Sequence, residues 1–178
     1  MIYGERIRLR AIEREDLPLF VNWLNDPEVR AGLIHYLPIS LTDEEQWYSV
    51  MLGSPLEEHP LVIEARNGEG WSPIGDCGFI RINWRCRTGE VGILIGEKKF
   101  WNRGYGTEVM HLLLRHGFST LNLNRISLDV YANNPGAIRC YEKAGFVQEG
   151  VRRQAMYKDG IYIDIIQMSV LKKEWQEI

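Results

Sequence analysis

The sequence predicts an α/β or α+β fold in which helices flank one mixed β-sheet. Two kinds of segment support this: runs in which apolar and polar residues alternate, as in half-buried strands, and runs with apolar residues at helical spacing. The two kinds are interleaved along the chain. Its 178 residues, 45% hydrophobic and 25% charged, are enough for one substantial core. No linker-like stretch divides the chain, so we expect a single domain over residues 1–178.

The first third of the chain predicts one strand and two helices. Residues 5–12, ERIRLRAI, alternate apolar side chains with arginines, which indicates a half-buried strand. Residues 14–26, REDLPLFVNWLND, place their apolar side chains on one helical face. Residues 40–52, SLTDEEQWYSVML, begin with a serine followed by acids, which the positive end of a helix dipole favours.

Three strands are expected next. The candidates are PLVIEAR at 60–66, PIGDCGFIRINW at 73–84 and GEVGILIG at 89–96. The charged turn RCRTG links the last two strands.

The segment EKKFWNRGYGTEVMHLLLRHGF, residues 97–118, predicts a helix that opens at Gly104 or Gly106. Its apolar residues recur at helical spacing. A helix start leaves backbone N–H groups without partners at the positive end of the dipole, so it can bind phosphate. Glycine allows close approach of a ligand, and Arg103 can add a charged contact. The alternative is an ordinary glycine-rich turn.

The last third alternates strand, helix and a strand pair. NRISLDVYA, residues 124–132, is strand-like, and NNPGAIRCYEKAGF, residues 133–146, reads as a helix. Asn134 is its expected N-cap, followed by proline at the first helical position, and Gly145 its left-handed C-terminal cap. A final strand pair turns around KDG at 158–160.

Charge is unevenly distributed along the chain. Residues 1–60 contain eleven Asp and Glu residues against five Arg and no Lys, a net charge of −6, whereas the remainder carries +3. This distribution suits a cationic substrate and an anionic cofactor, and a solvated acidic surface is the alternative. A basic stripe is absent, so we do not expect nucleic-acid binding.

Composition also bears on location and metals. No stretch approaches the ~20 apolar residues of a membrane helix, and MIYGERIRLR is charged from its start, so we expect a cytoplasmic protein without a membrane partner. Cys77, Cys86 and Cys140 are odd in number and lack CxxC spacing, so we expect reduced thiols and no metal site.

Two motifs in fixed order closely resemble those of the GNAT acetyltransferase superfamily. The acetyl-coenzyme A signature Arg/Gln-x-x-Gly-x-Gly/Ala is matched by Arg103-Gly104-Tyr105-Gly106-Thr107-Glu108, with Glu108 departing from the final Gly/Ala. The second motif, Asn-x-x-Ala-x-x-x-Tyr-x-Lys-x-Gly-Phe, is matched by Asn134, Ala137, Tyr141, Lys143, Gly145 and Phe146. The segments at 7–29, 89–108 and 151–175 are similar to the branch of RimJ/RimL-type protein N-terminal acetyltransferases and spermidine acetyltransferases.

The resemblance implies a mixed, mainly antiparallel sheet of about seven strands, splayed between the fourth and fifth. Acetyl-CoA is the implied cosubstrate. Its pyrophosphate would bind the amides of Arg103, Gly104, Tyr105, Gly106 and Thr107. Its pantetheine arm would pair with backbone groups of Ile93, Leu94 and Ile95, and contact Asn134 and Ala137.

Acetyl transfer to an amine requires a base, oxyanion stabilisation and a proton for the leaving thiolate. Glu90 is the first candidate base, with Asp76 or solvent as alternatives, because the resembling branch carries a glutamate at this position. An amide near Leu94 is the implied oxyanion donor, and Tyr141 the implied acid. Trp47 and Trp84 are candidate walls of an amine pocket through cation–π contact.

The expected activity is therefore acetyl-CoA-dependent N-acetylation of a primary amine: a protein N-terminus, a polyamine or another small amine. A catalytically silent acetyl-CoA-binding module is the main alternative. A nucleotide or dinucleotide binder ranks last, since the G-x-G-x-x-G fingerprint is missing. The acceptor and the oligomeric state stay open, a homodimer being one candidate.

Overall fold

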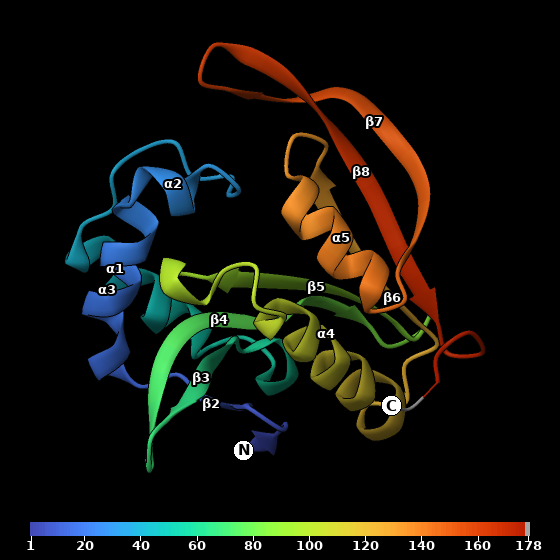
Figure 1. Cartoon of the computed structure of the whole chain (residues 1–178), viewed down its shortest axis with the longest axis horizontal. Coiled ribbons are helices and arrows are strands. Elements are labelled where there is room, and N and C mark those ends of the chain that lie inside the picture. Colours follow the sequence, from blue (N-terminus) through green and yellow to red (C-terminus); the bar gives the residue numbers. More distant parts are fainter. Residues whose placement is uncertain (177–178) are drawn as a thin grey trace.

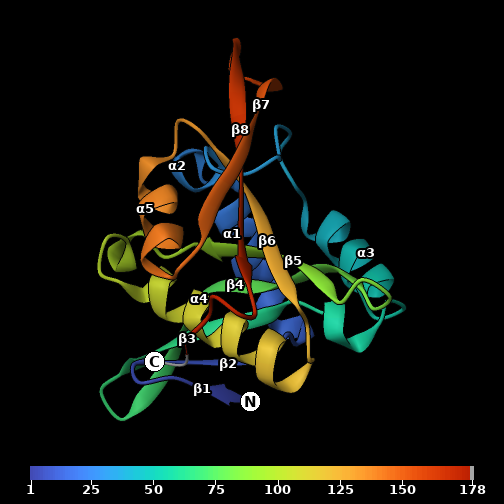
Figure 2. The ribbon, with the colours of Figure 1, turned by 90° about the vertical axis from the view of Figure 1, so that its right-hand side faces the viewer.

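The computed structural model describes residues 1–176 and has one eight-stranded mixed sheet with helices on both faces (Figures 1 and 2). The strands are β1 Ile2–Tyr3, β2 Ile7–Ala11, β3 Leu61–Asn67, β4 Gly70–Asn83, β5 Thr88–Ile95, β6 Arg125–Tyr131, β7 Val147–Lys158 and β8 Ile161–Leu171. The helices are α1 Leu17–Asn25, α2 Pro27–Arg30, α3 Leu41–Met51, α4 Tyr105–Arg115 and α5 Pro135–Lys143. The spatial order of the strands is β1-β2-β3-β4-β5-β6-β8-β7.

Side chains that alternate along the strands build two cores, one on each face of the sheet. On one face, Ile63 of β3 packs in the same cluster as Met110 of α4 and Phe146 after α5. On the other face, Val62 packs with Phe20 and Trp23 of α1, while the same cluster takes Tyr48 and Met51 from α3. The alternation that predicted the strands therefore also assigns each helix to a face.

The sheet opens between β5 and β6, the only parallel neighbours among the strands of residues 1–176. Their register joins Thr88–Glu90 to residues 125–127, and the strands then diverge. β5 stays paired with β4 up to Ile95, and β6 stays paired with β8. The expected splay thus occurs between the expected segments. It falls between the fifth and sixth strands because the two-residue β1 raises the strand count to eight.

The predicted helix caps are present. Asn134 Oδ1 accepts a hydrogen bond from the Ala137 amide at 3.1 Å, and Pro135 opens α5. Gly145 adopts a left-handed φ of 99° after α5, and Gly104 has φ 84° at the N-cap of α4. Only glycine adopts these two conformations without strain.

No helix within residues 1–176 has the length and apolar character needed to span a membrane.

The β7–β8 hairpin projects past the sheet toward the loop that follows α2 (Figure 1). At its end Lys158 is 7% exposed, and its Nζ donates hydrogen bonds to the carbonyl oxygens of Arg30 and Leu33. The C-terminal hairpin therefore anchors a loop that belongs to the first third of the chain.

Candidate active site

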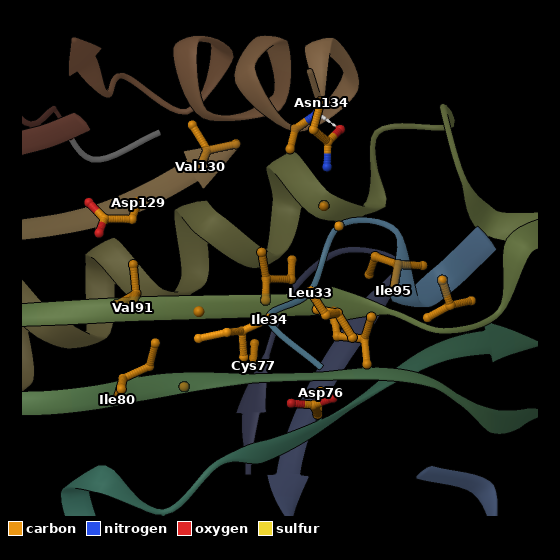
Figure 3. A pocket seen from close by; sticks show the side chains of 18 of the residues that line it. Leu33, Ile34, Asp76, Cys77, Ile80, Val91, Ile95, Asp129, Val130 and Asn134 are labelled. Atoms are coloured by element: carbon orange, nitrogen blue, oxygen red, sulfur yellow. Dashed lines mark hydrogen bonds between the residues drawn. The ribbon is translucent and has the colours of Figure 1, made fainter. Parts of the chain in front are cut away.

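A cavity of about 1420 Å³ lies where β5 and β6 diverge. β4, β5, the start of α4, α5 and the loop at 31–35 line it (Figure 3). It brings together most of the residues expected to act, namely Glu90, Ile93, Leu94, Ile95, Gly104, Tyr105, Gly106, Thr107, Asn134, Ala137 and Tyr141. Arg103 lies outside the wall that the described residues form and is exposed to solvent.

The start of α4 forms one end of this cavity. The helix begins after Gly104, so the amides of its first turn lack intrahelical acceptors. At Gly106 a Cβ would lie 3.0 Å from Cys140 Sγ, and Thr107 Oγ1 is 3.6 Å from the same sulfur. Because Gly106 has no side chain, α4 and α5 can approach each other closely. This contact lies beside the N-terminus of α4, whose free amides can bind an anion.

Glu108, which departs from the resembling signature, lies in the first turn of α4. Its carboxylate accepts hydrogen bonds from the backbone N–H and Nε of Arg6, at 2.8 and 2.9 Å. The negative charge of Glu108 is thus paired with Arg6, the residue that precedes β2.

Backbone groups of β5 face the opening of the sheet. The Leu94 carbonyl oxygen faces β4, since a Cβ on Gly75 would lie 1.9 Å from it. The N–H and C=O of one strand residue point to the same edge, so the Leu94 amide is also directed to β4. Because successive residues of a strand alternate in direction, the N–H and C=O groups of Ile93 and Ile95 point to the opening. The Ile95 carbonyl accepts a 2.7 Å hydrogen bond from Trp101 Nε1. Of the amides near Leu94, where the oxyanion donor is expected, those of Ile93 and Ile95 are therefore the ones directed toward the opening.

Asp76, labelled in Figure 3, lies on β4 directly opposite Leu94. Its other neighbour in the sheet is Val62, which belongs to the core on the face that carries α1 and α3. The Asp76 carboxyl lines the cavity, and loss of bulk water together with the nearby Glu44 carboxylate raises its pKa to about 7. Burial also raises the pKa of Glu44, which projects from α3 into the same cavity and is 6% exposed. A carboxyl whose pKa is near 7 can exchange a proton at neutral pH.

Glu90 has a different environment. It lies where β5 and β6 are still paired, and its Oε2 is 2.8 Å from Arg81 Nη2. The Arg81 side chain is 76% exposed, so this ion pair lies at the edge of solvent. Glu90 lines the cavity, but a cation already occupies one of its oxygens.

Tyr141 contributes a buried phenol from α5. The residue is 9% exposed, lines the cavity and packs against Phe146, with ring centroids 6.0 Å apart. Burial, and to a smaller degree the Cys140 thiol, raises the pKa of the phenol above its ordinary value. Tyr141 therefore stays protonated at neutral pH and can donate a hydrogen bond or a proton.

Acidic side chains dominate the cavity wall. Seven carboxylates line it, from Glu28, Asp43, Glu44, Glu58, Asp76, Glu90 and Asp129, against three strong bases, Arg139, Lys143 and Arg152. Trp47 also lines the cavity, whereas Trp84 lies outside the wall formed by residues 1–176. Of the two tryptophans expected at an amine pocket, the structure brings only Trp47 to the cavity.

The loop at 31–35 covers part of the cavity, and sequence reasoning did not identify it. A Cβ on Gly32 would lie 3.2 Å from Asn134 Nδ2, so this loop reaches the N-terminus of α5. In Figure 3, Leu33 and Ile34 are drawn between Asn134 and Asp76.

Within residues 1–176 no three His, Cys, Asp or Glu side chains are grouped as metal ligands would be.

Comparison with known proteins gives a consistent family. The model of the acetyltransferase (GNAT) domain matches residues 6–147. An uncharacterized N-acetyltransferase p20 of Bacillus licheniformis is 29% identical over 182 residues, which is 98% of this chain and 97% of that protein. The spermidine N(1)-acetyltransferase of Vibrio cholerae is 28% identical over 172 residues, 97% of this chain and 96% of that protein.

Solved structures agree with this. The crystal structure of a spermidine N-acetyltransferase from Vibrio cholerae in complex with CoA and spermine superposes with a TM-score of 0.87 at 28% identity, covering 96% of this chain and 98% of that one. A dodecameric structure of the spermidine N-acetyltransferase from that organism has a TM-score of 0.80 at 29% identity, covering 96% of each chain.

Proposed function

Because the chain belongs to the GNAT acetyltransferase family and is an acetyl-CoA-dependent N-acetyltransferase, we propose that its acceptor is a polyamine, a small linear molecule with several amines. One observation carries this proposal: the cavity wall is acidic, and it includes Asp76 and the buried Glu44, whose charge acts on Asp76. The Glu44 charge raises the pKa of Asp76, and a bound cation near the two groups would offset that repulsion. Protonated polyamines supply such cations at intervals along one chain.

Acetyl-CoA supplies an acetyl group activated as a thioester, and the residues of this chain fit it. We assign the pyrophosphate to the amides at the start of α4, from Gly104 to Thr107, and the pantetheine arm to backbone groups of Ile93 and Ile95. Asn134 and Ala137 border this arm in the proposal. The Arg103 side chain is exposed and lies outside the cavity wall, so in this proposal Arg103 contacts the pyrophosphate only through its backbone amide.

The start of α4 also supports a different alignment of the signature. If the motif begins at Trp101 and ends at Gly106, Gly104 and Gly106 take its two small positions. In this alignment Glu108 lies outside the signature, and the residue that differs from it is Trp101, at the position where the signature has Arg or Gln.

Proton transfer is assigned to two side chains. Asp76 acts as the base, directly or through water, because its pKa of about 7 matches the task and it faces the acidic acceptor end. Glu90 is the alternative base, and its pairing with Arg81 favours a role in attracting the acceptor. Tyr141 donates the proton for the departing thiolate.

Acceptor binding is assigned to the carboxylates and Trp47. The amine that reacts lies at Asp76, and a second ammonium group contacts Glu44 with Trp47 as a cation–π wall. The acceptor that the Vibrio cholerae relatives are named for, spermidine, has this repeated charge.

The finer family assignment is also a proposal. The segments at 7–29 and 151–175 support the branch of RimJ/RimL-type and spermidine acetyltransferases. A protein N-terminus is the competing acceptor, and it offers one amine rather than several.

Three further predictions remain: a single domain over residues 1–178, a cytoplasmic location and a homodimer. Sedimentation would separate a dimer from larger assemblies. Residues 177–178 lie outside the described part of the chain.

The test is a CoA-release assay with spermidine, peptides beginning with Ser or Ala, and aminosugars. We expect kcat/KM for spermidine to exceed that for the peptides by about tenfold or more, the effect of one additional charge contact. Glu44→Gln should raise the spermidine KM, and Glu45→Gln, one position along α3 and outside the cavity wall, should not. Preferred turnover of a Ser peptide, with Glu44→Gln unchanged, would instead support the N-terminal acceptor.

A further inference from the structure

Arg6 and Glu108 form a paired contact beside the proposed pyrophosphate loop, and neither lines the cavity wall built by the described residues. Glu108 is 15% exposed at its side chain and Arg6 46%. A Cβ on Gly4 would lie 2.9 Å from Glu108 Oε1, so backbone before β2 closes around the carboxylate. The hydrogen bond from Arg6 Nε to Glu108 Oε2 orients the guanidinium, and the one from the Arg6 backbone N–H to Oε1 fixes the main chain beside it.

The guanidinium then reaches the loop before α4. Arg6 Nη1 donates to the carbonyl oxygen of Arg103 at 3.1 Å. The same group lies over the Tyr105 ring, 4.6 Å from its centroid. A Cβ on Gly104 would lie 3.4 Å from Arg6 Nη2. Arg6 therefore contacts three consecutive residues at the mouth of α4.

One of these contacts sets the direction of a backbone amide. The Arg103 carbonyl and the Gly104 N–H belong to one trans peptide plane and point in opposite directions. Because the carbonyl is turned toward Arg6, the Gly104 N–H points away from Arg6. Gly104 lines the cavity, so this N–H is available at the helix mouth.

We propose that Arg6 and Glu108 are positioning residues that orient the Arg103–Gly104 peptide for the pyrophosphate of acetyl-CoA. The inference rests on the proposed cofactor site. Arg6 acts through the loop backbone, and its charge is balanced by Glu108 rather than offered to the phosphates. Glu108 in turn sits in the first turn of α4, where the helix dipole favours its charge, and Arg6 shields that charge from the diphosphate.

The test compares Arg6→Met and Glu108→Gln with wild type, using acetyl-CoA and S-acetylpantetheine as acetyl donors. The second donor lacks the pyrophosphate. We expect the KM for acetyl-CoA to rise about 5- to 30-fold, as for loss of one charge-assisted hydrogen bond, with kcat within about twofold. The kcat/KM for S-acetylpantetheine should stay at the wild-type value.

Arg115→Met is the matched control. Arg115 Nη2 donates to the Tyr3 carbonyl oxygen at 2.9 Å and ties the other end of α4 to the same N-terminal segment. This variant should leave both donors unaffected. Melting temperatures identify which variants are folded, and Glu108→Gln, which keeps the size of the side chain, provides a second reading if Arg6→Met unfolds.

Two results would overturn the inference: an unchanged KM for acetyl-CoA in folded variants, or an equal loss with both donors. Failure of the proposed function looks different, because wild type would then acetylate Ser peptides in preference to spermidine, and the comparison of the two donors could still be made with that acceptor.

Discussion

Replacing Asp76 by asparagine tests the assignment of the base and has two consequences of opposite sign. The change keeps the shape of the side chain and removes its titration. In the folded protein the pKa of Asp76 is about 7, against an ordinary value of 3.8. The fold therefore favours the neutral acid over the carboxylate.

The effect on stability follows from linkage. Below pH 3.8 the carboxyl is protonated in both the folded and unfolded states, and it carries no cost. As pH rises from 3.8 to 7, the unfolded chain ionises first and the folded state loses stability relative to it. Each pH unit in this window is worth about 1.4 kcal/mol, so the full loss approaches ~4 kcal/mol. Asp76 is partly open to solvent, which reduces the expected loss to about 2 kcal/mol.

Asparagine has no such loss, so Asp76→Asn should be more stable than wild type by about 2 kcal/mol at pH 8 and equal to it near pH 4. Urea unfolding at the two pH values measures this difference. Glu90→Gln should show no comparable gain, because Glu90 is already paired with Arg81.

Activity should move the other way. Loss of a positioned base should lower kcat by about 10²- to 10⁴-fold. Titration of the acceptor amine is common to both proteins, so the informative quantity is the ratio of wild-type to variant rate. That ratio should rise with pH below 7 and level off above it. A ratio constant from pH 5.5 to 9, or the same pH dependence found for Glu90→Gln instead, would refute Asp76 as the base.

Two further predictions concern α4 and α5. Tyr141→Phe should keep the melting temperature and acetyl-CoA binding while lowering turnover by roughly 10- to 10⁴-fold, because only the hydroxyl is lost; wild-type turnover where chemistry limits the rate would make Tyr141 a packing residue. Gly106→Asp should abolish the rise in melting temperature on adding acetyl-CoA, whereas Gly106→Ala, which makes the same 3.0 Å contact with Cys140 Sγ without a charge, should keep part of it. Equal losses in the two variants would assign the effect to that contact rather than to an anion site.

Local chemistry made much of this fold predictable. The α5 caps depend on Asn134, Pro135 and Gly145 alone, and the start of α4 depends on Gly104. Such features arise from residues a few positions apart, so the sequence contains all the information they need. The splay between β5 and β6 came from the family resemblance, since three residues of parallel pairing leave no periodic signal.

The missed features depend on contacts between distant parts of the chain. Glu44 looked like an acid placed for the helix dipole, and its effect on Asp76 appears only when α3 joins the core on that face of the sheet. Glu108 looked like a departure from a motif until Arg6 was found against it, 102 positions earlier. The Leu94 amide was expected to face the opening, but the register with β4 turns it the other way.

The Lys158 anchor makes one wall of the cavity depend on the completion of synthesis. The loop it holds is made early, and Lys158 follows 128 positions after Arg30 and 125 after Leu33. The strand added after it, β8, is the one that pairs along β6. A nascent chain that has emerged as far as α5 thus contains the residues assigned to the cofactor, but the loop at 31–35 is unanchored and β6 lacks its antiparallel neighbour β8. The last two strands therefore complete both the sheet and this wall of the cavity, so an unfinished chain on the ribosome does not yet have the finished site.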